Sequence, residues 1–561
     1  MPIYQRKMKS SIQKSPLNQV RSPQSMKSVA DIMLEQLTLW GVKRIYGVVG
    51  DAIFGLLDAI SKQSAIQFIQ VQHESVAAMM ASAEAKLTGG LGVCTAQMGP
   101  GIANLMNGLG DAYLDHSPVL AITGQAPLNK IGTDYKQYIN QQQLVKEFTR
   151  SSTLLTHPDT VVDVLVNAMK LAQIEGTVTH LSVPKDLFTK MTSVQPYKRP
   201  VMVSNDRQMY SKESLKQVIQ MMRSAKKPMI IAGIGAKSAG RTVEQLTGQW
   251  GAGLLTSLGA KGMVPDTSVR MLGGIGEGGN PYASNILKQA DVVLMIGTTW
   301  WPEGYVPIHT RVIQIEKHAI NIGKGPQVEM GVIGQPETII PILLDELKDY
   351  TQNPDWVRQV QEAGQSWALQ NQQEGNQVGS PIPPSRIIRA LEKTVSPDSI
   401  ITLDEGDVTL WFYRNFRAKQ QQVLISGHWR TMGFGLPAAL AAKLCRPDKQ
   451  VVAITGDGGL NMVLGDLLTA IQHRLKITLV VFNNKTLQME EDKMKRSGLN
   501  RLGVDLVNPD YVALAKACGW EAYRADSHIE LEETLQKALT GSQPTLVDVN
   551  TASITHPDFR K

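Results

Sequence analysis

The stretch VVAITGDGGLNM, residues 451–462, carries the pattern that decides the fold of this chain. Five apolar or small residues run into Gly-Asp-Gly-Gly, which indicates a buried strand that ends in a glycine-rich turn with the Asp457 carboxylate at its tip. A second apolar run, ITLVVF, ends in an Asn pair whose second member, Asn484, follows Asp457 by 27 residues. If both runs belong to one doubly wound α/β unit, their polar ends meet at the carboxyl edge of a parallel sheet.

These two strand ends offer oxygen ligands to a cation and close backbone approach to an anion. Asp457 and Asn484 supply a carboxylate and an amide oxygen, which suit Mg²⁺ when it also binds phosphate oxygens and water. The glycines beside Asp457 let main-chain N–H groups approach a diphosphate. The alternative is a plain tight turn and an ordinary helix cap, which fits the Gly-Asp-Gly turn alone better than it fits the turn, its apolar lead-in and the spacing together.

Composition limits the classes of protein to consider. At 561 residues, and at about 150 residues per domain, the chain should form three or four domains. Hydrophobic residues make up 42% and charged residues 19%, as in ordinary globular proteins, and no apolar run reaches the roughly 18 residues of a membrane span. The net charge is +7, but residues 1–26 hold five basic and no acidic residues, so the remainder carries +2. A nearly neutral body argues against a nucleic-acid partner.

The two chain ends and the cysteines indicate a cytoplasmic protein. Residues 1–26 are rich in Ser, Gln and Lys and lack the apolar core of a secretory signal; a flexible basic tail is expected, with an organellar transit peptide as the weaker alternative. Cys94, Cys445 and Cys518 are widely spaced and show no disulfide or metal pattern, which fits a reducing compartment. The final segment, ITHPDFRK, is too short for an amphipathic anchor, so no stable membrane association is expected.

Apolar strand-like runs alternate with helical stretches throughout, which predicts an α/β fold of three doubly wound parallel-sheet domains. Their expected limits are residues 27–192, 207–350 for a central Rossmann-like unit, and 386–550. A linker is expected at 193–206, and the polar stretch 351–385 is expected to separate the second unit from the third. The three units are expected to be structural relatives although their sequences hardly resemble one another.

The Gly-Asp-Gly turn followed by the Asn pair resembles the signature of thiamine diphosphate-dependent enzymes. The rest of the chain resembles their pyruvate oxidase and acetolactate synthase branch, over about residues 27–550, in the order pyrimidine-binding, central and diphosphate-binding domain. The resemblance implies that Asp457, Asn484 and the Thr486 carbonyl hold Mg²⁺, which bridges the diphosphate of the cofactor. It also implies cofactor contacts by the glycines of the turn, which are Gly456, Gly458 and Gly459.

The first unit carries a second feature that the resemblance requires. Glu74, in HESVAAMMASAEAKLTG, follows a strand and opens a helix. It matches the activating glutamate of the family, which bonds to pyrimidine N1′ so that the aminopyrimidine of the cofactor takes the C2 proton. The alternative is an ordinary first-turn helix charge. Because this glutamate reaches a cofactor held by another subunit in the family, a homodimer or homotetramer is implied.

Two further cofactor contacts follow from the resemblance. Met432, in WRTMGFGLPAALAAKL, matches the bulky apolar residue that lies under the cofactor and forces its bent shape. The alternative is a core methionine, which is what most methionines are. Gly50, at the end of RIYGVVG in the first unit, is also expected to contact the cofactor.

Several positions depart from the family pattern. The loop GTDYKQYIN keeps Gln137 of the loop beside the reactive carbon, but Lys136 replaces the usual Phe. The segment QMGPGIANL has Asn104 where pyruvate oxidases often have His. After the Asn pair, Met489 replaces a Phe and Lys493 replaces a Glu. Lys136, Gln137 and Asn104 are therefore candidate catalytic residues, and Met489 is a candidate cofactor contact.

The departures raise the question of pocket charge. Lys136 and Lys493, together with His428 and Arg430 beside Met432, would make a cationic pocket suited to a doubly anionic substrate or a nearby phosphate. The alternative is that both lysines lie on mobile loops and face water, as most lysines do.

The resemblance implies decarboxylation of a 2-oxo acid, with pyruvate oxidase-like chemistry expected first. An acetolactate synthase-like carboligase without redox chemistry is the alternative, and a non-catalytic scaffold of the same fold is the alternative from another class. FAD is a further cofactor that the central unit is able to bind in this branch, with Glu316 in the place of an acid for its ribose or adenine, but the glycine-rich turn there does not distinguish flavin-binding members from the others.

Overall fold

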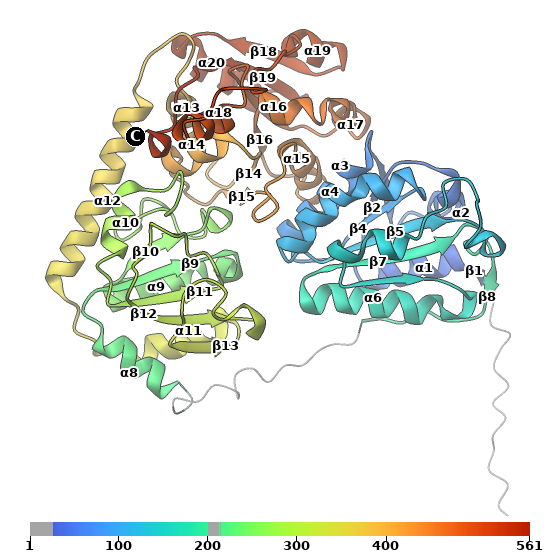
Figure 1. Cartoon of the computed structure of the whole chain (residues 1–561), viewed down its shortest axis with the longest axis horizontal. Helices are drawn as coiled ribbons and strands as arrows, with labels where there is room; N and C mark the ends of the chain where they lie inside the picture. Colours follow the sequence, from blue (N-terminus) through green and yellow to red (C-terminus); the bar gives the residue numbers. More distant parts are fainter. Residues whose placement is uncertain (1–25, 200–212, 214, 561) are drawn as a thin grey trace, which may run out of the picture.

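The computed structural model describes residues 26–199, 213 and 215–560, and its elements are labelled in Figure 1. The expected tail at 1–26, apart from Met26, lies outside the described residues, as does the expected linker from residue 200 onward. The described chain contains three parallel sheets, each with helices on both faces, as the sequence predicts. In Figure 1 the first unit is blue to teal, the central unit green and the third unit orange to red.

The first and third sheets have the same connectivity. Both are six-stranded and parallel, and both follow the spatial order second, first, third, fourth, sixth, fifth strand. In the first unit the strands are β3 (Gln67–Gln70), β2 (Arg44–Gly47), β4 (Gly92–Ala96), β5 (Val119–Gln125), β7 (Val178–Pro184) and β6 (Ser151–Leu154). In the third unit they are β15 (Gln422–Leu424), β14 (Ile400–Leu403), β16 (Val451–Gly456), β17 (Thr478–Asn483), β19 (Thr545–Asn550) and β18 (Glu521–Ala525).

The central sheet has five parallel strands and shares the first four places of that order. Its strands are β10 (Gly253–Thr256), β9 (Pro228–Ala232), β11 (Val292–Ile296), β12 (Arg311–Glu316) and β13 (Met330–Ile333). The inner strands of all three sheets are almost entirely buried, because helices cover both faces, and this is why they appear in the sequence as continuous apolar runs. The expectation that the three units are structural relatives is therefore confirmed at the level of strand order.

The helices form two layers around each sheet. In the first unit α1 (Val29–Leu39), α2 (Phe54–Ser61) and α6 (Val161–Glu175) share one core, and α3 (Glu74–Thr88) and α4 (Pro100–Leu114) another. In the central unit α8 (Lys216–Ser224), α9 (Gly240–Trp250) and α11 (Pro336–Glu346) share one core, and α10 (Pro281–Leu287) packs in the other with α12 (Pro354–Gly375). In the third unit α13 (Pro384–Thr394), α14 (Asp407–Asn415) and α20 (His528–Thr540) share one core. The other core of that unit is continuous with the core of α3 and α4 in the first unit, and it holds α15 (Gly435–Cys445), α17 (Leu467–Gln472) and α19 (Tyr511–Ala517).

Apart from short 3-10 turns, five further helices and strands belong to the described chain. They are α5 (Gln141–Leu144), α16 (Asp457–Asn461), α18 (Gln488–Arg496) and the antiparallel pair β1 (Lys27–Ser28) and β8 (Met191–Thr192). None of the helices in the described ranges combines the length and the apolar character that crossing a membrane requires.

The structure differs from the sequence analysis in the stretch 351–385. It was expected to separate two units, but α12 forms there and packs onto the central sheet. Its buried residues Trp356, Val360, Ala363 and Trp367 are spaced by three or four and form one apolar stripe, which the polar composition of the other faces hides. The central unit thus extends well beyond the expected limit near Tyr350.

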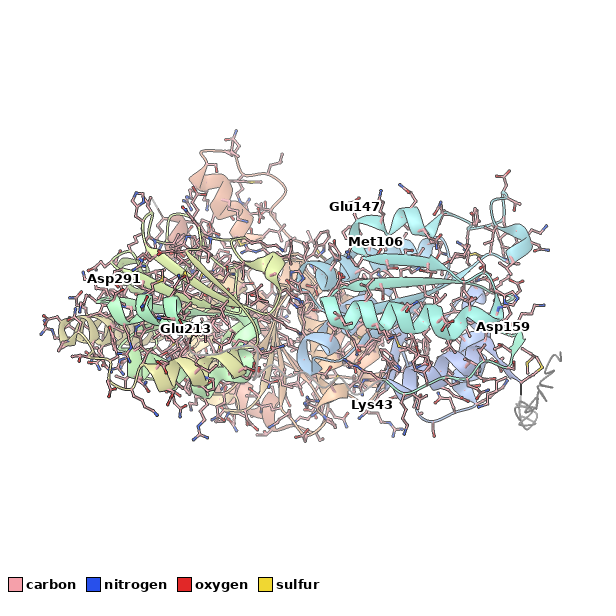
Figure 2. The ribbon with its side chains drawn as sticks, turned by 90° about the horizontal axis from the view of Figure 1, so that it is seen from below. Lys43, Met106, Glu147, Asp159, Glu213 and Asp291 are labelled. Atoms are coloured by element: carbon pink, nitrogen blue, oxygen red, sulfur yellow. The ribbon has the colours of Figure 1, made fainter. Side chains whose placement is uncertain are left out.

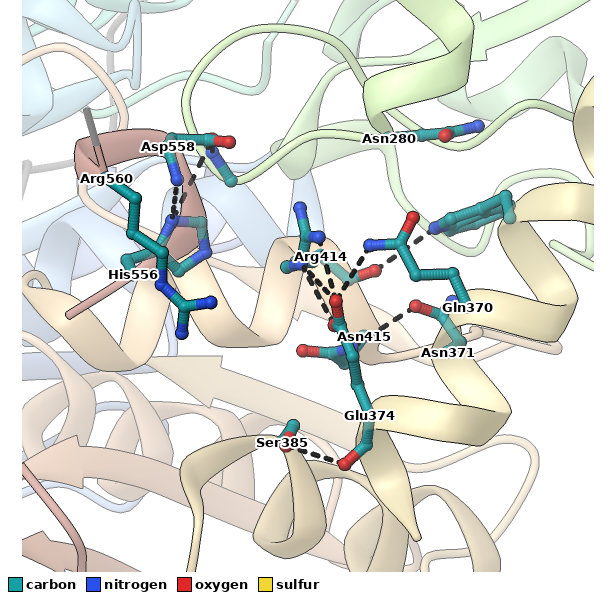
Figure 3. Close-up of polar contacts among 12 residues, drawn as sticks. Asn280, Gln370, Asn371, Glu374, Ser385, Arg414, Asn415, His556, Asp558 and Arg560 are labelled. Carbon is teal, nitrogen blue, oxygen red and sulfur yellow. Dashed lines mark hydrogen bonds and ion pairs between the residues drawn. The ribbon is translucent and has the colours of Figure 1, made fainter. Parts of the chain in front are cut away.

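Helix α12 also connects the central unit to the third. Figure 3 shows Glu374, near its end, accepting hydrogen bonds from Arg414 at 2.8 and 2.9 Å and from Asn415 at 2.7 Å, both on α14. The C-terminal segment adds a second connection, since the Gly278 amide of the central unit donates to Asp558 at 2.6 Å. Seen from below in Figure 2, the central unit with Asp291 lies on the left and the first unit with Asp159 on the right.

Candidate active site

The third unit forms one half of the candidate site, at the carboxyl ends of β16 and β17. These strands are parallel neighbours, with Gly456 opposite Phe482, so the Gly-Asp-Gly turn and the Asn pair meet at one edge as expected. Asp457 is buried; its Oδ1 accepts from the Gly458 amide at 2.9 Å, and its Oδ2 accepts from the Lys485 amide at 2.7 Å and Asn508 Nδ2 at 2.8 Å. Burial raises the pKa of the Asp457 carboxyl, and these hydrogen bonds oppose the rise.

The oxygen atoms beside Asp457 fit a hard cation. Asn484 Oδ1 accepts from the Thr486 amide at 3.2 Å. This hydrogen bond forms a tight turn from Asn484 to Thr486 just after β17. Within the part of the chain that the structure describes, no three His, Cys, Asp or Glu side chains form a metal site by themselves. One carboxylate with neutral oxygens is instead the donor set of an ion such as Mg²⁺ that completes its shell with phosphate oxygens and water.

The glycines of the turn differ in the space around them. A Cβ on Gly456 would meet nothing within 4 Å, which leaves its backbone open to a ligand. A Cβ on Gly458 would lie 3.1 Å from Met432 Cε and 2.7 Å from Leu487, so Met432 packs directly against the turn. A Cβ on Gly459 would lie 2.6 Å from a carboxylate oxygen of Asp404. Positions 458 and 459 thus require small residues, and Met432 lies beside the turn.

The loop before Met432 is held by α4 of the first unit. Asp115, just after α4, accepts from the Gly427 amide at 2.7 Å and the His428 amide at 2.8 Å. The Asp115 carboxylate also pairs with the buried Lys86 ammonium at 2.7 Å. This positive charge keeps the pKa of Asp115 well below its usual range. The first unit therefore fixes the backbone that carries Met432.

We expect Asp115→Ala to lower the free energy of unfolding by about 3 kcal/mol, because it breaks a buried ion pair with Lys86 and leaves the Gly427 and His428 amides without their acceptor. Urea denaturation followed by circular dichroism measures the change. As a control, Asp398→Ala removes an exposed ion pair with Lys449 and should leave the transition nearly unchanged. Equal midpoints for both variants would contradict the anchoring role of Asp115.

The first unit forms the other half of the candidate site. Glu74 is the first residue of α3, follows β3 closely and is only partly buried. Asn104 Nδ2, on α4, donates to Glu74 Oε2 at 3.0 Å, and a Cβ on Gly101 would lie 3.3 Å from Glu74 Oε1. The fold thus brings Asn104 and Glu74 together. Among the described residues, no hydrogen bond or ion pair joins Glu74 to the Gly-Asp-Gly turn of the same chain.

Gly50 and Gln137 approach each other through Gln97, a residue that the sequence analysis did not single out. Gln97 Nε2 donates to Gln137 Oε1 at 2.9 Å and to Asp51 at 2.7 Å, while a Cβ on Gly50 would lie 2.6 Å from Gln97 Oε1. Gln137 has a left-handed backbone, with φ +60°. Lys185 holds the pKa of Asp51 below its usual value by a hydrogen bond.

The basic residues that the sequence analysis singled out are exposed to solvent in the described chain. The Lys136 side chain is 69% exposed, with its Nζ 3.8 Å from Asp51, and Lys493 is 43% exposed and paired with Glu490 at 2.9 Å. Arg430 is exposed and has a left-handed backbone, with φ +55°. Met489 is the second residue of α18, partly buried, four residues before Lys493. The His428 side chain is 65% exposed, so these four basic residues do not form one buried cluster.

Other residues of the site carry no local signal in the sequence. Asn508, which binds Asp457, lies in the loop before α19, and Asp404 follows β14. Only their position at the carboxyl edge of the third sheet would have pointed to them. Glu316, the candidate flavin contact, is buried and accepts from the Lys317 amide at 3.0 Å.

Three domain models of one family match the chain in order. Residues 27–144 match the thiamine pyrophosphate enzyme N-terminal TPP binding domain, residues 215–343 the central domain, and residues 404–549 the C-terminal TPP binding domain. The chain belongs to the thiamine pyrophosphate enzyme family.

Curated relatives place the chain in one branch of this family. It is 34% identical over 529 residues to the putative thiamine pyrophosphate-containing protein YdaP of Bacillus subtilis, covering 93% of this chain and 91% of that protein. It is 31% identical over 537 residues to a pyruvate oxidase of Lactiplantibacillus plantarum, covering 92% and 87%. It is 30% identical over 542 residues to the acetolactate synthase isozyme 3 large subunit of Escherichia coli, covering 92% of each. The chain is a thiamine diphosphate-dependent enzyme of the pyruvate oxidase and acetolactate synthase branch.

Proposed function

We propose that this enzyme decarboxylates a 2-oxo acid with thiamine diphosphate and Mg²⁺, in the manner of a pyruvate oxidase. The proposal rests on two half-sites. One is the Asp457 carboxylate beside the Asn484–Thr486 turn at the end of β16, and the other is Glu74 at the start of α3 with its hydrogen bond from Asn104. Similarity to a pyruvate oxidase at 31% identity supports it. Similarity to acetolactate synthases at 27–30% supports the alternative, a carboligase without redox chemistry.

Each residue has a task in this proposal. Asp457, Asn484 and the Thr486 carbonyl would hold Mg²⁺, and the open backbone at Gly456 would bind the diphosphate. Met432, which packs against Gly458, would contact the cofactor. When bound, thiamine diphosphate supplies the carbon nucleophile that attacks the oxo carbon and accepts the electron pair left by CO₂.

Glu74 and its neighbours complete the site from the other half. Glu74 would hydrogen-bond the pyrimidine ring, and Asn104 orients the Glu74 carboxylate through its 3.0 Å hydrogen bond. Gln137 and Lys136 lie on the loop that faces the substrate. Since no hydrogen bond or ion pair joins Glu74 to the Gly-Asp-Gly turn within the described part of one chain, we propose that two copies pair so that each site takes one half from each, in a homodimer or homotetramer. The three free cysteines fit a cytoplasmic enzyme.

The visible spectrum of the purified protein tests which chemistry applies. For a pyruvate oxidase-like enzyme we expect a stoichiometric flavin band that pyruvate bleaches without oxygen, because substrate electrons pass to FAD. A colourless protein that forms acetolactate from pyruvate would favour the carboligase. A protein that binds neither thiamine diphosphate nor Mg²⁺ in calorimetric titration would instead be a scaffold that has lost its chemistry.

A further inference from the structure

One acidic residue at the carboxyl edge of the third sheet has no role so far. Glu405 lies two residues after β14, which pairs in parallel with β16, and Leu403 is opposite Ile454. The strand order reverses between these two strands, so Glu405 follows one of them and the Gly-Asp-Gly turn follows the other. Ligands of doubly wound sheets bind at this reversal point.

The backbone of Glu405 is fixed beside Met432. Asp404 Oδ1 accepts from the Glu405 amide at 2.9 Å and from the Gly433 amide at 2.8 Å, and Asp404 Oδ2 accepts from Thr455 at 2.7 Å. Asp404 therefore joins β14, β16 and the loop that carries Met432. Glu405 is held next to the place where Met432 contacts the turn.

The Glu405 carboxylate itself is without a partner in the described chain: no hydrogen bond or ion pair reaches it, although the residue is partly buried. A partly buried carboxylate without donors costs free energy of folding. By contrast, the neighbouring carboxylate of Asp404 is hydrogen-bonded, as are those of Asp457 and Asp115 elsewhere in the site. The free carboxyl of Glu405 is thus available to a ligand.

Charged groups on three elements act on Glu405. Arg430 lies in the loop before α15, Lys493 on α18 and Asp404 on the end of β14. Burial raises the pKa of Glu405 to about 7, with Arg430 and Lys493 lowering it and Asp404 raising it. Near neutral pH the carboxyl is therefore present in both protonation states, and a further negative charge nearby would favour the protonated one.

We propose that Glu405 faces the bound 2-oxo acid and takes up a proton when this anion binds, which selects substrates with a single carboxylate. The proposal rests on the function proposed above and names its substrate class. The protonated carboxyl donates a hydrogen bond to the substrate, while Arg430 and Lys493 supply positive charge. A second carboxylate on the substrate would lie near the acidic Glu405, which disfavours its binding. The sequence analysis had instead considered a pocket lined only by basic side chains.

Calorimetry with oxamate, an unreactive analogue of pyruvate, tests the proposal on the enzyme loaded with thiamine diphosphate and Mg²⁺. Titrations at pH 7 in phosphate and in Tris, which differ in ionisation enthalpy, give the number of protons bound with the ligand. Since a group with a pKa near 7 is about half ionised at this pH, we expect uptake of up to about half a proton by the parent enzyme. Glu405→Gln should bind oxamate with no uptake.

Two further variants separate this role from a structural one. Glu490→Gln removes the exposed partner of Lys493 and should leave proton uptake unchanged. Lys493→Gln should reduce the uptake, because without that cation Glu405 is more fully protonated before the ligand arrives. This variant keeps the test valid if Glu405→Gln does not fold.

Equal proton uptake in the parent and in Glu405→Gln, absence of uptake in the parent, or failure of the loaded parent to bind oxamate would each overturn the proposal. Cofactor binding and pyruvate turnover are measured separately, so they distinguish failure at Glu405 from failure of the proposed function.

Discussion

Replacing Glu74 with Gln is expected to slow hydrogen–deuterium exchange at C2 of the bound cofactor by about 10²–10⁴-fold, the usual contribution of a positioned acid or base. The carboxyl of Glu74 lies at the start of α3 with one oxygen on Asn104 and the other near Gly101, so an amide of the same size fits without repacking. Gln is unable to exchange a proton with the pyrimidine as a carboxyl does. Acid-quench NMR of the bound thiamine diphosphate measures the rate.

A matched control distinguishes this role from an ordinary helix charge. Glu530 is an exposed acid in the first turn of α20, as Glu74 is in the first turn of α3. We expect Glu530→Gln to leave both the exchange rate and the fold unchanged. If the Glu74 and Glu530 variants exchange at the same rate as the parent, Glu74 is only a first-turn charge.

Asp457→Ala is expected to weaken binding of thiamine diphosphate with Mg²⁺ by more than about 100-fold. Loss of a residue that only hydrogen-bonds to a metal ligand already costs about 10–100-fold in affinity, so loss of the ligand itself should cost more. Asn508, which donates to Asp457 Oδ2 at 2.8 Å, is such a partner, so Asn508→Ala should fall within that smaller range. Isothermal titration of the cofactor at fixed Mg²⁺ gives both affinities.

The order of these two effects is the critical result. Asp448→Asn, which changes an exposed acid shortly before β16, should bind the cofactor as the parent does. An Asp457→Ala variant with parental affinity would contradict the assignment of the metal site. An effect of Asn508→Ala larger than that of Asp457→Ala would move the metal ligand to another residue.

The sequence determined the class of fold and the two poles of the site. Parallel strands covered on both faces must be apolar along their whole length, so the three sheets were visible as repeated apolar runs. The Gly-Asp-Gly turn and Asn484 each end a strand, and Glu74 begins a helix after one, so their position depends on local order along the chain. The sequence analysis did not predict helix α12, because its apolar residues lie on one face of a mostly polar segment.

Only the tertiary structure decided how these parts are completed. Asn508 donates to Asp457, which is 51 residues away in the sequence, and the His428 amide donates to Asp115, which is 313 residues away. Asp404, just after β14, accepts from the Gly433 amide in the loop before α15. Glu405 is distinguished by what surrounds it: partial burial, two cations at a distance and no partner among the residues that the structure describes. The physical reason is that burial and charge at a side chain come from segments far apart in the sequence, and the local pattern of residues does not contain them.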